Sequence, residues 1–367
     1  MYPIIEIDLK KVEENARCIT NLFNPMGITI MAVTKGFSAD ERIVSALVRG
    51  GVDFLADSRL RNLKKLKNFP LKKILLRLPM ASEVDDLVKF ADYSMNSELS
   101  TLKEIGKAAW RNRTTHKVII MVDLGDHREG IQPKHLDEFI GHAVKIKGIE
   151  IRGFGVNMTC LNGVIPEEKT LIKLVDLAQK MQEKYKITIE IISGGSSSSV
   201  YLIDEGKIPE GINNLRLGEV ILLGKEAAYG KRFHNLCEDI FTLKTQIIEI
   251  KDKPSMPKGL IGKDAFGNIP FHEDRGILRR AIVALGRQDA DPKGITPRNR
   301  KIKILGASSD HMIVDVTEDP DHYEVGDIMT FDLNYSGMLR AMTSPYVGRV
   351  YLNEEAHKVS LPQVSDL

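Results

Sequence analysis

Short apolar runs and amphipathic helical patterns alternate through the first two thirds of the chain. The run 28–34 opens this series; it is apolar on both faces and ends at Lys35 and Gly36. Such runs are typical of strands in a parallel sheet that helices cover on both sides. Eight strands of this kind are expected, at residues 28–34, 52–56, 73–78, 92–95, 117–124, 149–156, 187–192 and 214–217.

Helical patterns separate these strands. They lie near residues 39–50, 58–67, 83–90, 98–112, 133–146, 167–185 and 198–206. Eight alternating units of strand and helix predict an α/β fold, a TIM-like (β/α)8 barrel. A doubly wound open sheet is the alternative, but that fold more often stops at about five or six strands.

The pattern changes near Arg232, where clear helical segments cease. The later runs are strand-like and lie at residues 240–250, 280–285, 301–305, 311–316, 328–332 and 346–353. They predict a second domain of mainly antiparallel strands. We therefore divide the chain into a barrel domain, 1–232, and a C-terminal β domain, 233–367. At the start, residues 4–7 indicate a short strand, and Asp8 can cap a helix over Leu9–Phe23.

Composition narrows the class of protein. The 367 residues carry a formal charge of only +2, which does not indicate nucleic acid or an anionic membrane as a partner. Three cysteines, Cys18, Cys160 and Cys237, suggest reduced thiols in a cytoplasmic protein. No apolar run approaches the ~20 residues of a spanning helix, and the N-terminus has no signal-peptide pattern. We expect a soluble cytoplasmic protein.

Side chains suited to chemistry follow the ends of the predicted barrel strands, where the active site of this fold lies. These residues are Lys35, Arg128, Asn157, Ser193, Ser196, Ser197, Arg216 and Gly218. The Gly-Gly-Ser-Ser run 194–197 follows the seventh strand, where such barrels hold phosphate near a helix N-terminus. By itself a Gly/Ser run is more often a flexible connector.

A lysine amine and a phosphate pocket on opposite rims of one barrel suit two kinds of reaction. One uses pyridoxal phosphate, whose aldehyde condenses with a lysine while its phosphate is anchored separately. The other is a sugar-phosphate aldolase that uses a lysine imine. Arg216 favours the cofactor, because a pyridine nitrogen needs a partner beside the ring and a sugar phosphate has no such group. The predicted site contains no metal.

Several segments carry motifs in a fixed order. They are Glu-Ile-Asp-Leu at 6–9, Val-Thr-Lys at 33–35, Gly-Asp-His-Arg-Glu-Gly at 125–130, Leu-Arg-Leu-Gly at 215–218, and the strands at 306–316 and 323–327. In this order they resemble the alanine racemase family, the fold-type III pyridoxal-phosphate enzymes, over nearly the whole chain. The resemblance is closest to members that act on ornithine.

The resemblance implies a role for each residue. Lys35 would carry the cofactor and act as one catalytic base. Arg216 would meet the pyridine nitrogen and, as a donor that stays protonated, leave that nitrogen unprotonated. Arg128 would pair with the substrate carboxylate. Asn157 stands where many relatives place a histidine against the ring. The phosphate contacts would come from Ser193, Ser196, Ser197 and Gly218. For each arginine alone, a structural salt bridge is the alternative.

The sequence departs from the family pattern at the second base. Relatives often supply a tyrosine from the second domain of a partner subunit, but the matching run 286–290 is Gly-Arg-Gln-Asp-Ala. His311 is our first candidate, because imidazole titrates near neutrality. A structural histidine between strands is an equal alternative. Weaker candidates are Tyr335, Tyr346 and Cys160. Two other family positions also differ, with Met121 in place of a carbamylated lysine and Ala39 in place of a phosphate-binding tyrosine.

These departures argue against a plain alanine racemase. The predicted activity is racemisation of ornithine or another basic amino acid, with Glu129, Asp289 and Asp310 available for a cationic side chain. Alternatives are a racemase for alanine or another small amino acid, a non-catalytic cofactor carrier, and a decarboxylase on the same scaffold. The intact second domain argues against a carrier, and Arg216 argues against a decarboxylase. The family also implies a head-to-tail homodimer.

Overall fold

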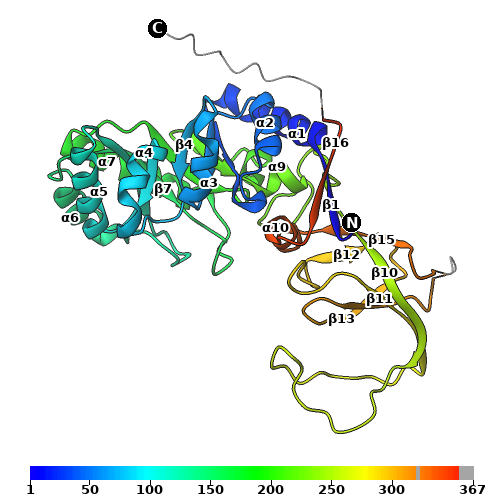
Figure 1. Cartoon of the computed structure of the whole chain (residues 1–367). Helices are drawn as coiled ribbons and strands as arrows, with labels where there is room; N and C mark the ends of the chain where they lie inside the picture. The colour runs from blue at the N-terminus through cyan, green and yellow to red at the C-terminus, as the bar shows by residue number, and fades with distance from the viewer. Residues whose placement is uncertain (320–322, 355–367) are drawn as a thin grey trace.

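The computed structural model describes residues 1–319 and 323–354. Eight parallel strands form a closed barrel in which the last strand pairs with the first, as predicted (Figure 1). The barrel strands are β2 (Thr29–Val33), β3 (Phe54–Asp57), β4 (Lys72–Leu75), β5 (Tyr93–Asn96), β6 (His116–Val122), β7 (Ile149–Val156), β8 (Ile191–Ser196) and β9 (Asn214–Leu217).

Helices surround this barrel. They are α1 (Leu9–Phe23), α2 (Glu41–Arg49), α3 (Leu60–Lys65), α4 (Val84–Phe90), α5 (Leu99–Arg111), α6 (Pro133–Ala143), α7 (Glu168–Tyr185), α8 (Tyr201–Asp204) and α9 (Glu219–Leu223). Short 3₁₀ turns are η1 (Asn24–Met26), η2 (Lys35–Phe37), η3 (Leu66–Asn68) and η4 (Ala81–Glu83). Asp8 caps α1 as expected, since its carboxylate accepts a hydrogen bond from the Lys11 amide at 3.2 Å.

Buried side chains fill the barrel interior. They include Met31, Ala56, Ile74, Tyr93, Met95, Ile119, Met121 and Ile191. Outside the barrel wall, apolar faces of the helices cover the strands. Because both faces of the sheet are covered, the strands are the apolar runs that the sequence pattern indicated.

The rest of the chain forms the predicted, mainly antiparallel sheet. Its strands are β10 (Phe241–Pro254), β11 (Ile277–Val283), β12 (Ile295–Pro297), β13 (Lys303–Ala307), β14 (Met312–Asp315), β15 (Ile328–Leu333) and β16 (Gly348–Leu352). The N-terminal strand β1 (Ile4–Asp8) also belongs to this sheet, where it pairs with β10 and β16. The division at residues 232 and 233 stays a prediction.

One helix in this region, α10 (Tyr335–Thr343), was not predicted. Asn334 caps it by accepting a hydrogen bond from the Gly337 amide at 3.1 Å. The helix packs against η2 so closely that a Cβ at Gly36 would lie 3.0 Å from Met338 Cε and 3.5 Å from a ring carbon of Tyr335. This contact brings the C-terminal region to the mouth of the barrel beside Lys35.

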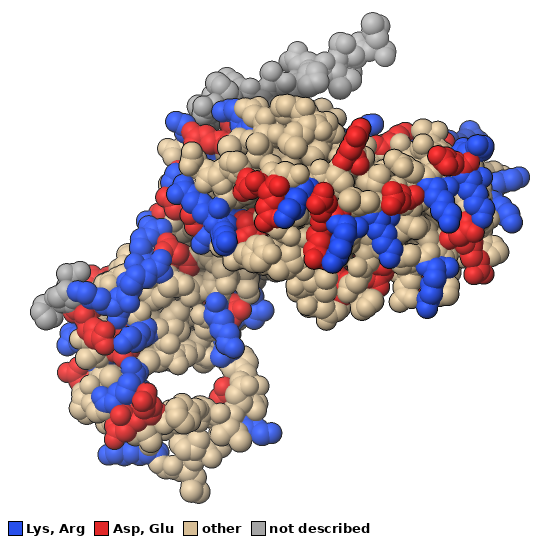
Figure 2. All heavy atoms as spheres, turned by 180° about the vertical axis from the view of Figure 1, so that it is seen from behind, with Lys and Arg blue, Asp and Glu red and all other residues tan. Residues whose placement is uncertain are grey.

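The surface mixes charges of both signs, in keeping with the small net charge (Figure 2). Among the helices described, none has the length and apolar character that crossing a membrane requires.

Candidate active site

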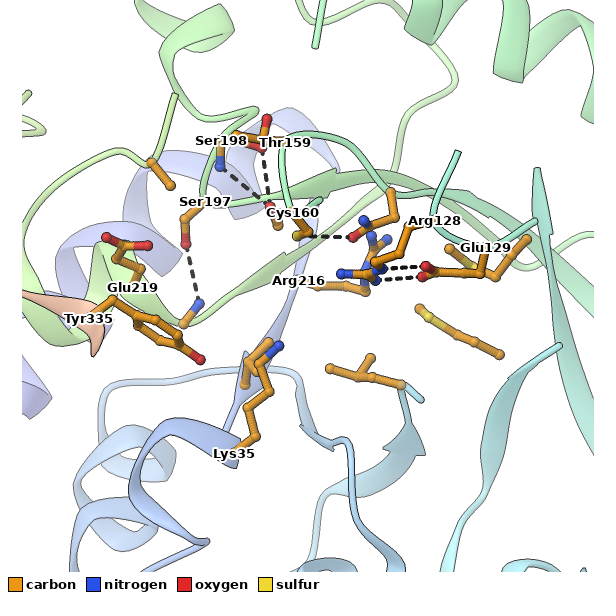
Figure 3. Close-up of a pocket in the computed structure, with 18 residues that line it drawn as sticks. Lys35, Arg128, Glu129, Thr159, Cys160, Ser197, Ser198, Arg216, Glu219 and Tyr335 are labelled. Carbon is orange, nitrogen blue, oxygen red and sulfur yellow. Dashed lines mark hydrogen bonds and ion pairs between the residues drawn. The ribbon is translucent and has the colours of Figure 1, made fainter. Parts of the chain in front are cut away.

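A cavity of about 380 Å³ opens at the carboxyl end of the barrel strands (Figure 3). Most of its lining comes from the segments that directly follow these strands, and α10 adds Tyr335. The lining residues are Val33, Lys35, Leu76, Met95, Met121, Arg128, Glu129, Asn157, Thr159, Cys160, Ser196, Ser197, Ser198, Arg216, Gly218, Glu219, Ala227 and Tyr335. The structure therefore brings together seven of the predicted residues: Lys35, Arg128, Asn157, Ser196, Ser197, Arg216 and Gly218.

Lys35 projects into the cavity from η2, just after β2 (Figure 3). Burial lowers the pKa of its amine, and the positive charges of Arg128 and Arg216 act in the same direction. The preceding residue is firmly held, because the Thr34 hydroxyl donates a 2.6 Å hydrogen bond to the buried Asp57 carboxylate. Lys35 is thus a positioned amine that more readily becomes neutral than an exposed lysine.

Arg216 lies on β9 with only 5% of its surface exposed. Its guanidinium donates 2.7 Å hydrogen bonds to the Ser193 hydroxyl and to the Val156 carbonyl. Burial lowers the pKa of Arg216 to about 10, so the side chain still carries a positive charge at neutral pH. Ser193 does not line the cavity; it supports Arg216 and donates to Asn214 at 2.7 Å. Its predicted phosphate contact stays a prediction.

The serine loop, residues 196–199, begins at the end of β8 and contacts the start of α9. The Ser197 hydroxyl accepts hydrogen bonds from the Gly218 and Val220 amides at 3.4 and 3.2 Å. The loop turns at Gly195, where φ is +119° and a Cβ would lie 2.3 Å from the Ser199 hydroxyl. Hydroxyl groups and backbone amides thereby converge at one end of the cavity, a donor set suited to a phosphate.

Arg128 and Glu129 form a bidentate ion pair inside the cavity, in the loop after β6 (Figure 3). The hydrogen bonds that Arg128 donates to Glu129 raise the pKa of Arg128. The loop is anchored by Asp123, which accepts hydrogen bonds from the Gly125 and His127 amides at 3.0 and 3.1 Å. The arginine predicted to bind a substrate carboxylate therefore already holds a carboxylate of this chain.

Asn157 directly follows β7 and has 8% of its surface exposed. Its Oδ1 accepts a 3.4 Å hydrogen bond from the Cys160 thiol, whereas its Nδ2 has no partner within the described residues. A buried amide without a partner is costly. This donor is available to a molecule bound in the cavity.

Besides Ser193, the predicted residues His311, Asp310 and Asp289 do not line the cavity of this chain. His311 and Asp310 pair with each other in an exposed turn, at 2.9 Å. Asp289 is buried and accepts hydrogen bonds from Gly286 N and from the Ser344 hydroxyl, at 3.2 and 3.0 Å. Their functional roles stay predictions.

Two carboxylates near the site were not predicted. Asp57 ends β3 and accepts a hydrogen bond from Thr34, the neighbour of Lys35. Glu219 lines the cavity beside Ser197 and Tyr335 (Figure 3). Burial, with a further contribution from Glu226, raises the pKa of Glu219. Both residues could have been noticed, because each lies at the carboxyl end of a predicted barrel strand, where this fold places its active site.

Comparison with known proteins identifies the family. Residues 7–225 match the model of the N-terminal domain of alanine racemase. The chain belongs to the alanine racemase family. Ornithine racemase from Acetoanaerobium sticklandii is 50% identical over 96% of this chain and 100% of its own length. Lysine racemase from Thermotoga maritima is 39% identical over 96% of this chain and 99% of its own.

Solved structures of the alanine racemase family share the fold. Alanine racemase from Bartonella henselae with covalently bound pyridoxal phosphate superimposes with a TM-score of 0.73 and 16% identity. The match covers 96% of this chain and 100% of that one. The two-part architecture of barrel and antiparallel sheet is thus shared across low sequence identity.

Proposed function

We propose that this protein is a pyridoxal-phosphate-dependent amino-acid racemase that interconverts the enantiomers of ornithine or a closely related basic amino acid. The observation that carries the proposal is the cavity. The amine of Lys35 faces Arg216 and the serine loop there, in a chain that is 50% identical to an ornithine racemase.

The residues present fit pyridoxal phosphate. Asn157 Nδ2 is a buried donor with no partner among the residues that the structure describes, and the serine loop with Gly218 presents hydroxyl and amide groups at one end of the cavity. Lys35 would hold the aldehyde end, Ser196, Ser197 and Gly218 the phosphate, and Arg216 the pyridine nitrogen. When bound, the cofactor withdraws electrons from the substrate Cα and so makes its hydrogen acidic.

The side chains of this protein would then orient the substrate and move its proton. Arg128 binds the substrate carboxylate with two hydrogen bonds. Lys35 removes the Cα proton on one face, a task favoured by the burial that lowers its pKa. Arg216 keeps its own protons and donates to the ring nitrogen. This disfavours competing reactions that need a protonated ring.

The Arg128–Glu129 pair supports a substrate with two charged groups. The two side chains hold each other in the cavity, and Glu129 is largely buried there with 14% of its side chain exposed. A diamino acid can replace this contact, because its carboxylate pairs with Arg128 and its side-chain ammonium pairs with Glu129. Both protein charges then have a partner again. An amino acid with a neutral side chain leaves Glu129 without a cation, which disfavours its binding.

We also propose the head-to-tail homodimer implied by family membership, in which the second domain of one subunit covers the cavity of the other. This arrangement provides a route for His311, Asp289 and Asp310 to approach a site, since none of them reaches it within one chain. We further propose a cytoplasmic location, based on three cysteines without a disulfide.

The test is a panel of single-enantiomer amino acids incubated with the purified protein and analysed by chiral chromatography. We expect ornithine to racemise fastest, and Lys35→Ala to abolish both racemisation and the absorption band of the bound cofactor. Racemisation by Lys35→Ala at the wild-type rate would contradict the mechanism. A carrier protein would show no exchange of the Cα hydrogen in deuterated water, and a decarboxylase would release carbon dioxide.

A further inference from the structure

A racemase needs a proton-transfer group on each face of Cα, and Lys35 provides only one. Besides arginine, five titratable side chains line the cavity among the described residues: Lys35, Glu129, Cys160, Glu219 and Tyr335. The contacts of each side chain indicate which of them can serve as the second proton-transfer group.

Three of the other four are unsuited to this task. Glu129 is held by the bidentate pair with Arg128. Glu219 and Tyr335 lie together at the end of the cavity where Ser197 meets Gly218 (Figure 3). Tyr335 also packs on Gly36, directly beside Lys35, and burial raises its pKa to about 12. At that pKa the phenol rarely ionises near neutrality.

Cys160 has a different position. It follows β7, and Figure 3 shows it entering the cavity from the side opposite Lys35, next to Arg216. Its thiol is oriented by a 3.4 Å hydrogen bond to Oδ1 of the buried Asn157. The free Nδ2 of the same amide is an independent sign that a bound molecule belongs at this spot.

We propose that Cys160 is a catalytic residue, the proton donor and acceptor on the face of the substrate opposite Lys35; this inference rests on the proposed racemase function. In one direction the Lys35 amine takes the Cα proton and becomes an ammonium. The S–H bond of Cys160 breaks, and its proton forms the new bond with the electron pair left at Cα. Exchange with solvent then restores the amine and the thiol, and the reverse direction exchanges the two roles.

The surroundings suit this exchange of charge. Cys160 acts electrostatically on Lys35, Arg128 and Arg216, which places it within the field of three cationic side chains. Arginine stays positively charged at neutral pH, so Arg128 and Arg216 keep this field positive throughout the exchange.

The inference is tested with Cys160→Ala and with Cys160→Ser, which nearly keeps the size of the side chain but not its acidity. Cys18→Ser is the matched control, because Cys18 is exposed on α1, outside the cavity. We expect both Cys160 variants to lose about 100-fold or more of the ornithine racemisation rate, the usual contribution of a positioned acid or base. Cofactor binding, followed by absorbance, should be unchanged.

Deuterium exchange separates a catalytic role from a packing role. With Lys35 intact, the Cys160 variants should exchange the Cα hydrogen of one ornithine enantiomer for deuterium without inverting it, and leave the other unlabelled. A packing defect would slow exchange of both enantiomers alike and would overturn the proposal. Racemisation at the wild-type rate in Cys160→Ala would also overturn it.

Alkylation of the wild-type enzyme provides a measurement that does not depend on the folding of a variant. Iodoacetamide should inactivate the enzyme with labelling of Cys160, and ornithine should protect it. Full activity after complete labelling of Cys160 would overturn the proposal. A wild-type protein that neither racemises nor exchanges any amino acid would refute the racemase function itself, and the role of Cys160 with it.

Discussion

The ion pair between Arg128 and Glu129 suits a zwitterionic substrate that carries one additional positive charge. Without Glu129, the guanidinium of Arg128 would lack this carboxylate partner and would repel the Lys35 ammonium. With Glu129 bound, the charge of Arg128 is balanced and its guanidinium is held in one orientation. A substrate carboxylate has to displace the Glu129 carboxylate from Arg128. The affinity for a substrate therefore depends on whether its side chain gives Glu129 a new cationic partner.

Glu129→Gln tests this exchange. We expect KM for ornithine to rise at least ~10-fold, because the amide cannot pair with the side-chain ammonium. KM for norvaline, which has the same carbon chain without the amine, should stay equal or fall. Initial rates of racemisation over a range of substrate concentrations provide both constants.

Glu104→Gln is the control for this experiment, since Glu104 lies on α5 and pairs with Lys107 outside the cavity. An equal rise in KM for ornithine and norvaline would show that Glu129 serves only to position Arg128.

At the scale of elements, the barrel provides fixed platforms for the site. Lys35 lies just after β2 and Arg216 on β9, so the strand ladder sets their backbone positions, whereas Arg128 and Cys160 lie in the loops after β6 and β7. At the opposite end of the barrel, His116 is the first residue of β6. This histidine is buried and exchanges a 2.9 Å hydrogen bond with the Ser94 hydroxyl on β5.

Burial lowers the pKa of His116 from 6.5 to about 4. Between these two values the unfolded chain binds a proton that the folded chain does not, so stability falls as the pH falls through this window. The loss amounts to about 3 kcal/mol by pH 4, and the effect is absent above pH 6.5.

Urea unfolding of the wild-type protein and of His116→Gln, at about pH 7 and at about pH 4, measures the effect. The amide can keep a bond to Ser94 but does not titrate, so the variant should lose about 3 kcal/mol less than the wild type over this range. Other carboxylates contribute equally to both proteins. Identical losses in the two proteins would contradict the assignment to His116.

For the whole molecule, the segment 255–276 between β10 and β11 is the most prominent surface feature (Figure 1). It protrudes from the second sheet and exposes Leu260, Ile261, Ile269 and Phe271. Several exposed apolar side chains on one segment are unfavourable in water and typical of an interface. They support the proposed homodimer, and we propose that they are buried there.

Light scattering coupled to gel filtration tests this expectation. The wild-type protein should have a mass of about 82 kDa, twice the 41.1 kDa of one chain. Leu260→Asp combined with Phe271→Asp should shift the mass toward 41.1 kDa. Trp110→Asp is the control, because Trp110 is equally apolar and exposed but lies on α5, at the far end of the barrel (Figure 1). A wild-type monomer would contradict the proposed dimer.

Pairing of β1 with β10 and β16 joins the beginning and the end of the described chain in one sheet. We propose that the division near residue 232 still separates the two units, with β1 as the contribution of the N-terminus to the second one. This pairing could not be read from residues 4–7, because a short strand carries no information about its partner.

The sequence by itself determined the alternating units of the barrel, the antiparallel second sheet, and seven of the predicted residues at the cavity. These features depend on local periodicity and on the rule that a barrel places its site at the carboxyl ends of the strands. The sequence predicted that Lys35 and Arg216 share one site, because each lies near the carboxyl end of a strand of the same closed barrel.

Only the tertiary structure decided which groups meet within the cavity. Three features depend on loop conformation and on contacts between distant segments. They are the bidentate ion pair of Arg128 with Glu129, the packing of α10 against Gly36, and the position of Cys160 opposite Lys35. Periodicity does not specify these contacts, because loops follow no repeating pattern and side-chain directions are set by packing. The tertiary structure therefore defines the surroundings in which each residue recognised in the sequence acts.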